Sequence, residues 1–119
     1  MKELPPQVQN QLAQFQQLQQ QLQVLATQRL QLEAKLREIE NTLQELSKVG
    51  ADTPVYRSTG SLLIRVQDRD GLKKELEEQK ETLGIRVNTI KKQEKSFGER
   101  YEQLQQKLSE ALEGGRSGA

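Results

Sequence analysis

Residues 21–46 read QLQVLATQRLQLEAKLREIENTLQEL. Their apolar positions recur in alternating steps of three and four, and only Arg29 breaks the series: Leu22, Leu25, Leu32, Leu36, Ile39, Leu43 and Leu46. Such spacing places the apolar side chains on one narrow stripe of an α-helix, as in a coiled coil. A narrow seam joins two helices but leaves no cavity for a substrate. The stretch therefore predicts a binding or assembly protein and argues against an enzyme.

A second series of the same kind follows a short central insert, and Glu94 is its one polar member. Its residues are Leu83, Val87, Ile90, Glu94, Phe97, Tyr101, Leu104 and Leu108. The two series predict a mostly α fold, a long antiparallel coiled-coil hairpin with the insert at its centre. We expect a single domain over residues 1–119, with helices over 6–48 and 70–112 and a flexible, glycine-rich tail over 113–119.

Local signals set the expected ends of the helices. Pro5 and Pro6 suit the start of the first helix, where a missing N–H group is no loss. Gly50 can supply a left-handed C-terminal cap to that helix. Asp68 and Asp70 offer side-chain oxygens that can cap the start of the second helix.

Two details of the seam need separate attention. Its register slips between Phe15 and Leu22, which predicts a stammer that locally overwinds the supercoil. Folding about Gly60 pairs residues whose numbers sum to about 119, so that Arg29 and Glu94 fall one layer apart. These two side chains can bridge across the seam and fix its register, or each can extend to water, and we favour the second interpretation.

Composition restricts the function. With 33% hydrophobic residues in 119, the chain cannot enclose a large core, and the absence of Cys and His argues against thiol chemistry, neutral-pH acid–base catalysis and metal sites. We expect no cofactor. The net charge is +1 with no basic stripe, so we expect no nucleic-acid partner. No segment resembles a membrane span or a signal peptide, which predicts a cytoplasmic protein without a membrane partner.

The central insert reads VYRSTGSLLIRV over residues 55–66. Two β-branched or aromatic runs flank Ser58-Thr59-Gly60, which predicts a β-hairpin with Leu62, Ile64 and Val66 on one face. An isolated two-stranded hairpin is at best marginally stable in water, and this one carries apolar side chains and two open edges. We therefore expect hairpins from several chains to pair into a shared sheet or barrel, which would make the protein an oligomer.

The alternative is that the hairpin folds back onto the top of its own coil, near Leu46, Val49 and Leu72. So small a shelf would leave one face and both edges of the hairpin uncovered.

The free ends of the helices are a second candidate site. From Leu4 to Gln28 there is no charged residue, and glutamines surround the apolar positions. A seam framed in this way can splay and expose apolar side chains to irregular, apolar ligands: Leu12, Phe15, Leu104, Leu108 and Leu112. The alternative is an ordinary polar face on an ordinary coiled coil.

Several motifs closely resemble the prefoldin β-class subunits. They are Pro5-Pro6-Gln7-Val8-Gln9, Gln11-Leu12 with the glutamine-rich run, the hairpin over residues 55–65, and Arg86, Ile90 and Lys92-Gln93-Glu94 in the second helix. The resemblance covers nearly the whole chain, and its Val-Tyr-Arg-Ser-Thr-Gly hairpin is the most specific part. One hairpin matches the β class, because α-class subunits carry two.

The resemblance implies a hexamer of two α-class and four β-class subunits, in which the hairpins form a β-barrel platform. It implies an ATP-independent holdase that grips unfolded client proteins at the coiled-coil tips and passes them to a group II chaperonin. By position, the platform would use Val55, Tyr56, Arg57, Ser58, Leu62, Leu63, Ile64, Arg65 and Val66. The client-binding tips would use Val8, Leu12, Phe15, Leu104, Leu108 and Leu112, together with Leu4 if it is ordered.

A rival hypothesis from another class is a structural adaptor. Such a coiled coil would also oligomerise through the β-hairpin, but it would recruit folded partners through its helix faces. Suppression of the aggregation of a heat-denatured protein separates the two hypotheses, because only the holdase should suppress it.

Overall fold

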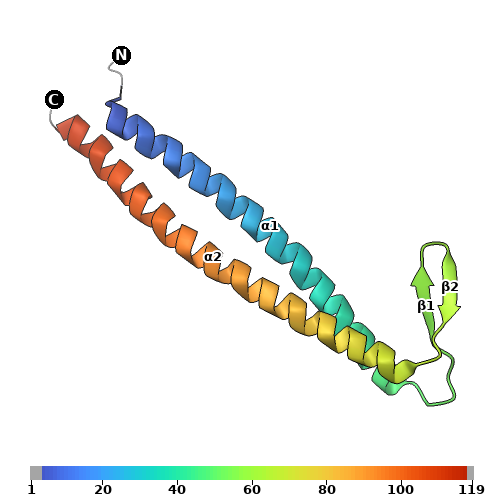
Figure 1. Cartoon of the computed structure of the whole chain (residues 1–119). Helices are drawn as coiled ribbons and strands as arrows, with labels where there is room; N and C mark the ends of the chain where they lie inside the picture. The colour runs from blue at the N-terminus through green and yellow to red at the C-terminus, as the bar shows by residue number, and fades with distance from the viewer. Residues whose placement is uncertain (1–3, 118–119) are drawn as a thin grey trace. The chain divides into compact units, whose positions relative to one another are not determined.

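The computed structural model of the chain consists, in chain order, of a long helix, a small β-hairpin and a second long helix (Figure 1). It describes residues 4–117. The elements are α1 (Pro6–Lys48), β1 (Tyr56–Thr59), β2 (Leu62–Arg65) and α2 (Arg69–Ser117). The predicted fold class, two long helices with a central antiparallel hairpin, is confirmed.

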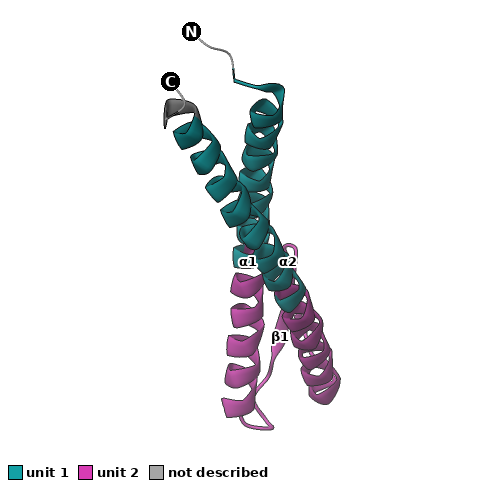
Figure 2. Cartoon of the chain, turned by 90° about the vertical axis from the view of Figure 1, so that its left-hand side faces the viewer, with its two compact units in different colours: residues 1–30, 88–119 teal, residues 31–87 magenta. Residues whose placement is uncertain are grey.

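The chain divides into two compact units, each of which contains a part of both helices (Figure 2). Unit 1 consists of residues 1–30 and 88–119, and unit 2 consists of residues 31–87. Unit 1 therefore holds the start of α1 and the end of α2, whereas unit 2 holds the hairpin and the helix segments next to it. The single domain that the sequence suggested over residues 1–119 stays a prediction.

The apolar stripe of α1 is regular along the whole helix. Its buried and half-buried members follow in alternating steps of three and four: Val8, Gln11, Phe15, Leu18, Leu22, Leu25, Arg29, Leu32, Leu36, Ile39, Leu43 and Leu46. The predicted stammer is wrong, because the stripe takes Gln11 in place of Leu12. Leu12 is left 38% exposed beside it. An unbroken heptad rhythm thus outweighs the preference of one leucine for burial.

The stripe of α2 keeps the same steps of three and four from Leu83 onward, after one skipped position between Leu76 and Leu83, and it carries most of the deeply buried residues. Its members are Leu72, Leu76, Leu83, Val87, Ile90, Glu94, Phe97, Tyr101, Leu104 and Leu108. Five apolar side chains in the described part of the chain are buried: Ile39, Leu83 and Val87 in unit 2, and Ile90 and Leu108 in unit 1. The core is therefore a thin line of side chains between helices, as the low apolar content predicted.

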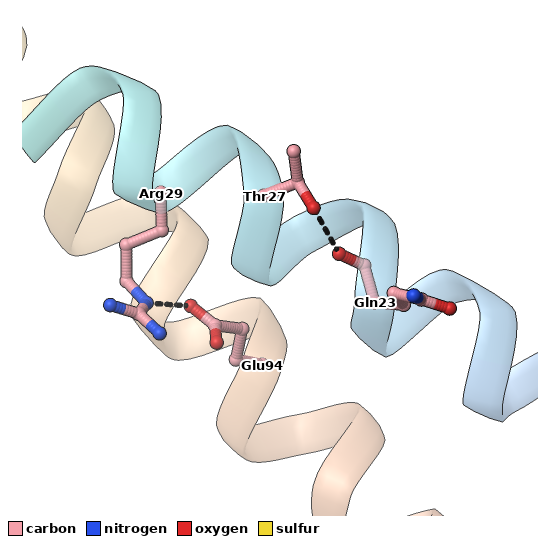
Figure 3. A network of polar contacts seen from close by, with 4 residues as sticks. All are labelled: Gln23, Thr27, Arg29 and Glu94. Atoms are coloured by element: carbon pink, nitrogen blue, oxygen red, sulfur yellow. Dashed lines mark hydrogen bonds and ion pairs between the residues drawn. The ribbon is translucent and has the colours of Figure 1, made fainter.

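An ion pair crosses the seam of unit 1 (Figure 3). The Nε atom of Arg29 donates to Oε1 of Glu94 at 2.6 Å, and the two side chains are only 25% and 21% exposed. The interpretation in which both side chains extend to water is wrong. Each charge loses most of its hydration in the seam, which is unfavourable. The direct ion pair compensates for part of this desolvation penalty.

The end of α1 differs from the sequence expectation. A left-handed cap at Gly50 would require a positive φ. Among the described residues only Gly60 has a positive φ, so Gly50 does not form the predicted cap. Instead, the guanidinium of Arg69 donates to the carbonyl oxygens of Gly50 at 2.7 Å and of Ala51 at 3.2 Å. A forked donor from the start of α2 thus satisfies carbonyls just beyond the end of α1.

The start and end of α2 also lie outside the predicted range of 70–112. The backbone N–H of Gly71 donates to Oδ1 of Asp68 at 2.9 Å, so Asp68 is the N-cap and the helix begins at Arg69. The helix continues to Ser117, and the expected tail from residue 113 is therefore helical to that point. Glycine weakens a helix by about 1 kcal/mol but keeps both backbone hydrogen-bonding groups, so it need not end one. Residues 118–119 lie outside the described residues.

The hairpin follows from one glycine. Gly60 has a φ of +59° and forms a two-residue turn with Ser61, whose φ is not positive; this combination fits a type II′ turn. Thr59 then pairs with Leu62, and Tyr56 with Arg65. The observed turn, Gly60-Ser61, therefore shares only Gly60 with the predicted Ser58-Thr59-Gly60, because Ser58 and Thr59 belong to β1.

We predict that the cap at Asp68 accounts for a measurable share of helix stability. Asp68→Ala should lower the free energy of unfolding by about 1 kcal/mol because the Gly71 N–H loses its acceptor. Asp68→Asn keeps an acceptor oxygen and should stay close to the parent. Urea unfolding followed by circular dichroism measures both variants. Equal losses in the two variants would contradict the cap.

Candidate functional site

The β-hairpin presents its apolar side chains to solvent. All eight strand residues are exposed, and Leu62 and Leu63 reach 65% and 73%. Successive side chains along a strand point to opposite faces of the sheet, so Leu62 and Ile64 lie on one face and Leu63 lies on the other. Both faces of the sheet therefore carry large exposed apolar groups.

The backbone of the hairpin is equally open. The sheet has two strands, so each strand has one edge without a partner strand in the described chain. Beyond the strands, the N–H of Val66 donates to the carbonyl of Val55 at 2.8 Å and closes the base of the hairpin. A short exposed sheet with free edges and apolar faces is a ready template for pairing with another chain.

The hairpin is tied to α2 by one ion pair. Nη2 of Arg57 lies 2.7 Å from Oε2 of Glu75, and both side chains are about half exposed. The first hairpin residues also line a cleft of about 720 Å³ together with Leu46, Val49 and Leu72. The hairpin thus stands beside the shelf that the fold-back alternative named. That shelf does not cover it, because every strand residue stays exposed.

The lining of the cleft beside the hairpin includes three glutamates and Arg57. Glu38, Glu45 and Glu75 line it together with apolar side chains from both helices. The hairpin itself carries Arg57 and Arg65.

The assembly residues predicted from the sequence all belong to one exposed element or its base in unit 2: Val55, Tyr56, Arg57, Ser58, Leu62, Leu63, Ile64, Arg65 and Val66.

The predicted tip residues all lie in unit 1, near the start of α1 and the end of α2. They divide into three groups by exposure. Leu4, Leu12 and Leu112 are exposed, and Val8, Phe15 and Leu104 are half-buried in the seam. Leu108 is only 8% exposed and belongs to the core of the unit. A ligand can therefore reach the first group directly, whereas the others become accessible only where the helices part.

An aromatic contact closes the seam close to these tips. The rings of Phe15 and Tyr101 are stacked, with centroids 4.5 Å apart and planes inclined by 20°. Folding about Gly60 predicted that facing residue numbers sum to about 119. The numbers of Phe15 and Tyr101 sum to slightly less than this value, and those of Arg29 and Glu94 sum to slightly more, so both contacts agree with the predicted pairing. Phe15 is thus a structural residue of the seam, whatever else it contacts.

Sequence reasoning did not single out the apolar residues on the outer helix faces. Val24, Leu30 and Ile85 are all more than half exposed and lie outside the two stripes. The signal that could have found them is their position between the heptad steps. Single exposed apolar residues are common on protein surfaces, but these three give useful comparison sites for the tips.

Two further searches bear on the site. Across the described residues, no group of three or more metal-ligating side chains comes together. The same part of the chain has no helix with a stretch long and apolar enough to cross a bilayer.

Comparisons with known proteins point to one family. The family model for the prefoldin subunit matches residues 9–115. A prefoldin subunit beta from Archaeoglobus fulgidus is 53% identical over 112 residues, with 94% of this chain and 96% of the relative covered. A second, from Thermoplasma volcanium, is 52% identical over 103 residues, with 87% and 83% covered. The crystal structure of the prefoldin beta subunit from Thermococcus strain KS-1 superposes with a TM-score of 0.82 at 35% identity, covering 94% of this chain and 97% of that one.

We predict different stability costs for two neighbouring tip residues. Phe15→Ala removes a stacked, half-buried ring and should lower the free energy of unfolding by roughly 2–3 kcal/mol. Leu12→Ala truncates an exposed side chain and should cost roughly 0.5 kcal/mol or less. Urea titration of both variants tests the difference. A larger loss for Leu12 would mean that Leu12, and not Gln11, occupies the seam.

Proposed function

Because the chain belongs to the prefoldin subunit family, a family of chaperone subunits, we propose that it is the β-class subunit of a hexameric holdase. In this proposal two α-class and four β-class subunits form the hexamer in the cytoplasm. The complex holds unfolded clients at the coiled-coil tips without ATP and transfers them to a group II chaperonin. The exposed hairpin is the observation that carries the proposal.

The hairpin supports assembly through its lack of cover. Leu62, Leu63 and Ile64 are half or more exposed, and an isolated sheet of this size gains little stability from its own contacts. Pairing its edges with hairpins of other subunits would satisfy the backbone groups and bury the apolar faces at once. A closed barrel of hairpins removes the free edges altogether.

The ends of unit 1 support client binding through their chemistry. Leu4, Leu12 and Leu112 are exposed there, and no charged residue occurs between Leu4 and Gln28. An unfolded client exposes apolar side chains in no fixed arrangement. Scattered leucines among uncharged glutamines can contact such a chain without requiring a matching charge, and burial of each leucine contributes roughly 1.5–3 kcal/mol when complete.

The adaptor is the second candidate, and one observation favours it. Val24, Leu30 and Ile85 expose apolar groups on outer helix faces, where a folded partner could dock. The holdase predicts that substitutions at the helix ends impair function. The adaptor predicts that substitutions at the outer faces do.

The first test concerns assembly. Leu62→Glu with Ile64→Glu places charges where the proposal requires apolar contact between subunits, and should abolish the complex formed with an α-class subunit. Helicity should stay unchanged because both side chains are exposed within the chain. Light scattering behind a sizing column measures the mass. Leu30→Glu, at a leucine on α1 whose exposure lies between those of Leu62 and Ile64, is the control and should assemble normally. An unchanged mass in the hairpin variant would refute the platform.

The second test concerns client holding. The triple variant Leu4→Ser, Leu12→Ser and Leu112→Ser should assemble normally. Suppressing the aggregation of a heat-denatured protein should then require at least about tenfold more complex, because several leucine contacts are lost. The matched control replaces the outer-face residues Val24, Leu30 and Ile85 by Ser. If only this control variant lost function, the adaptor would be supported instead.

A further inference from the structure

The base of the hairpin is anchored within unit 2. The N–H of Val66 donates to the carbonyl of Val55 at 2.8 Å and joins the two chain segments where they leave the strands. Both valines are half-buried. Nearby, the guanidinium of Arg69 donates to the carbonyl oxygens of Gly50 and Ala51, which fixes the start of the loop that leads into β1. The hairpin therefore starts from a defined position.

Beyond its base, the hairpin receives little support from its own chain. All eight strand residues are exposed, so no apolar packing fixes the position of the strands. A cleft of about 720 Å³ lies between β1 and the two helices, and a second cleft of about 300 Å³ lies between the hairpin and the start of α2. Such an element can pivot about its base unless a contact further along the strands holds it.

The contact that can hold the strands is the ion pair between Arg57 and Glu75. Nη2 of Arg57 lies 2.7 Å from Oε2 of Glu75, and in the described part of the chain no other hydrogen bond or ion pair joins a strand residue to a helix. Arg57 follows Val55 by two positions, so the contact acts roughly 7 Å from the base of the hairpin. Both charged residues line both clefts. The ion pair thus spans the space between the hairpin and α2.

We propose that the Arg57–Glu75 ion pair is a strut, which holds the hairpin at the angle to α2 at which it assembles with other subunits. The part of this proposal that concerns assembly rests on the proposed function, whereas the strut itself is a property of the isolated chain. Arg57 is then a positioning residue. Glu75 becomes part of the assembly machinery although it lies on α2 and the sequence did not single it out.

The strut is weak, but no stronger interaction competes with it for control of the angle. An ion pair with half-exposed side chains favours its own geometry by up to about fivefold. That factor is too small to hold a fold together, yet it is sufficient to bias an element that is otherwise free to pivot. A subunit binds its partners more weakly when its competent orientation is less populated. Loss of the strut should therefore weaken assembly by about two- to fivefold for each hairpin, without unfolding the chain.

Three variants of the full-length chain test the strut. Glu75→Gln removes the charge of the acceptor and leaves all the assembly residues predicted from the sequence in place. Arg57→Glu with Glu75→Arg restores the ion pair in reverse. Lys48→Gln is the matched control, because it removes the exposed ion pair with Glu45, in which no hairpin residue takes part. All three should keep the helicity of the parent in circular dichroism.

Spin labels measure the angle of the hairpin in the isolated chain, which contains no cysteine of its own. Cysteines are introduced at two exposed positions of unit 2, Ser61 in the hairpin turn and Glu81 on α2. Labelled chains are diluted with an excess of unlabelled chains so that only distances within one chain are seen. The parent, the charge-reversed variant and the control should each give one narrow distance distribution, and Glu75→Gln should give a broader one. An equally narrow distribution in Glu75→Gln would overturn the strut.

Assembly is measured with unlabelled chains, by light scattering over a series of concentrations after mixing with an α-class subunit. Glu75→Gln should bind about two- to fivefold more weakly per hairpin than the parent. The charge-reversed variant should recover the affinity of the parent, and Lys48→Gln should never lose it. Unchanged affinity in Glu75→Gln would overturn the proposal. A reversed pair that failed to restore assembly would also overturn it, because Arg57 would then act by contacting another subunit.

The two measurements also separate this proposal from the proposed function. If Leu62→Glu with Ile64→Glu left assembly intact, the hairpin platform would be refuted, and the part of this proposal that concerns assembly would be overturned with it. The distances in the isolated chain would still decide whether the strut exists. If those substitutions abolished assembly and Glu75→Gln did not weaken it, the platform would stand and the positioning role of the ion pair would be refuted.

Discussion

The apolar stripes of α1 and α2 pack against each other and hold the two helices together, and the other features of the protein depend on this packing. Helices of this length bury very little in pairs, and only Ile39, Leu83, Val87, Ile90 and Leu108 are buried in the described part of the chain. The hydrophobic contribution is therefore spread thinly along the seam, with no large core to dominate it. Local devices such as the Asp68 cap and the Arg69 contacts then matter more than they would in a globular domain.

The proposed function rests on what the stripes leave uncovered. A two-helix seam can bury only one face of each helix, so the hairpin between the helices receives almost no cover from its own chain. Leu62 and Leu63 remain exposed on opposite faces of the sheet. Because the seam buries only one face of each helix, Leu112 also remains exposed near the end of α2. Apolar surface at the hairpin and at the helix ends is thus a direct result of a core only one residue wide.

The sequence was sufficient for the features that depend on periodicity or on one residue's conformational preference. Steps of three and four placed both helices, and Gly60 placed the hairpin turn to within one residue. It was insufficient where a distant contact decided the outcome. Gly50 needs no left-handed cap because Arg69 reaches the carbonyl groups beyond α1. Gln11 takes the stripe position because the register is set by many layers together, and one favourable leucine, Leu12, cannot change it.

The candidate client-binding tip is a second place where the sequence was insufficient, because packing between the helices decided which residues are exposed. Spacing grouped Leu108 with Leu112, since both are apolar and lie one helical turn apart. The structure separates them, because Leu108 faces the seam and Leu112 does not. Leu108 and Leu112 are thus only one helical turn apart, but Leu108 packs between the helices and Leu112 is available to a ligand. A ligand that displaced Leu108 from the seam would have to compensate for lost helix packing, whereas contact with Leu112 carries no such cost. Binding at the exposed leucines is therefore compatible with an intact coiled coil, and deeper engagement would be coupled to opening of the seam from its end.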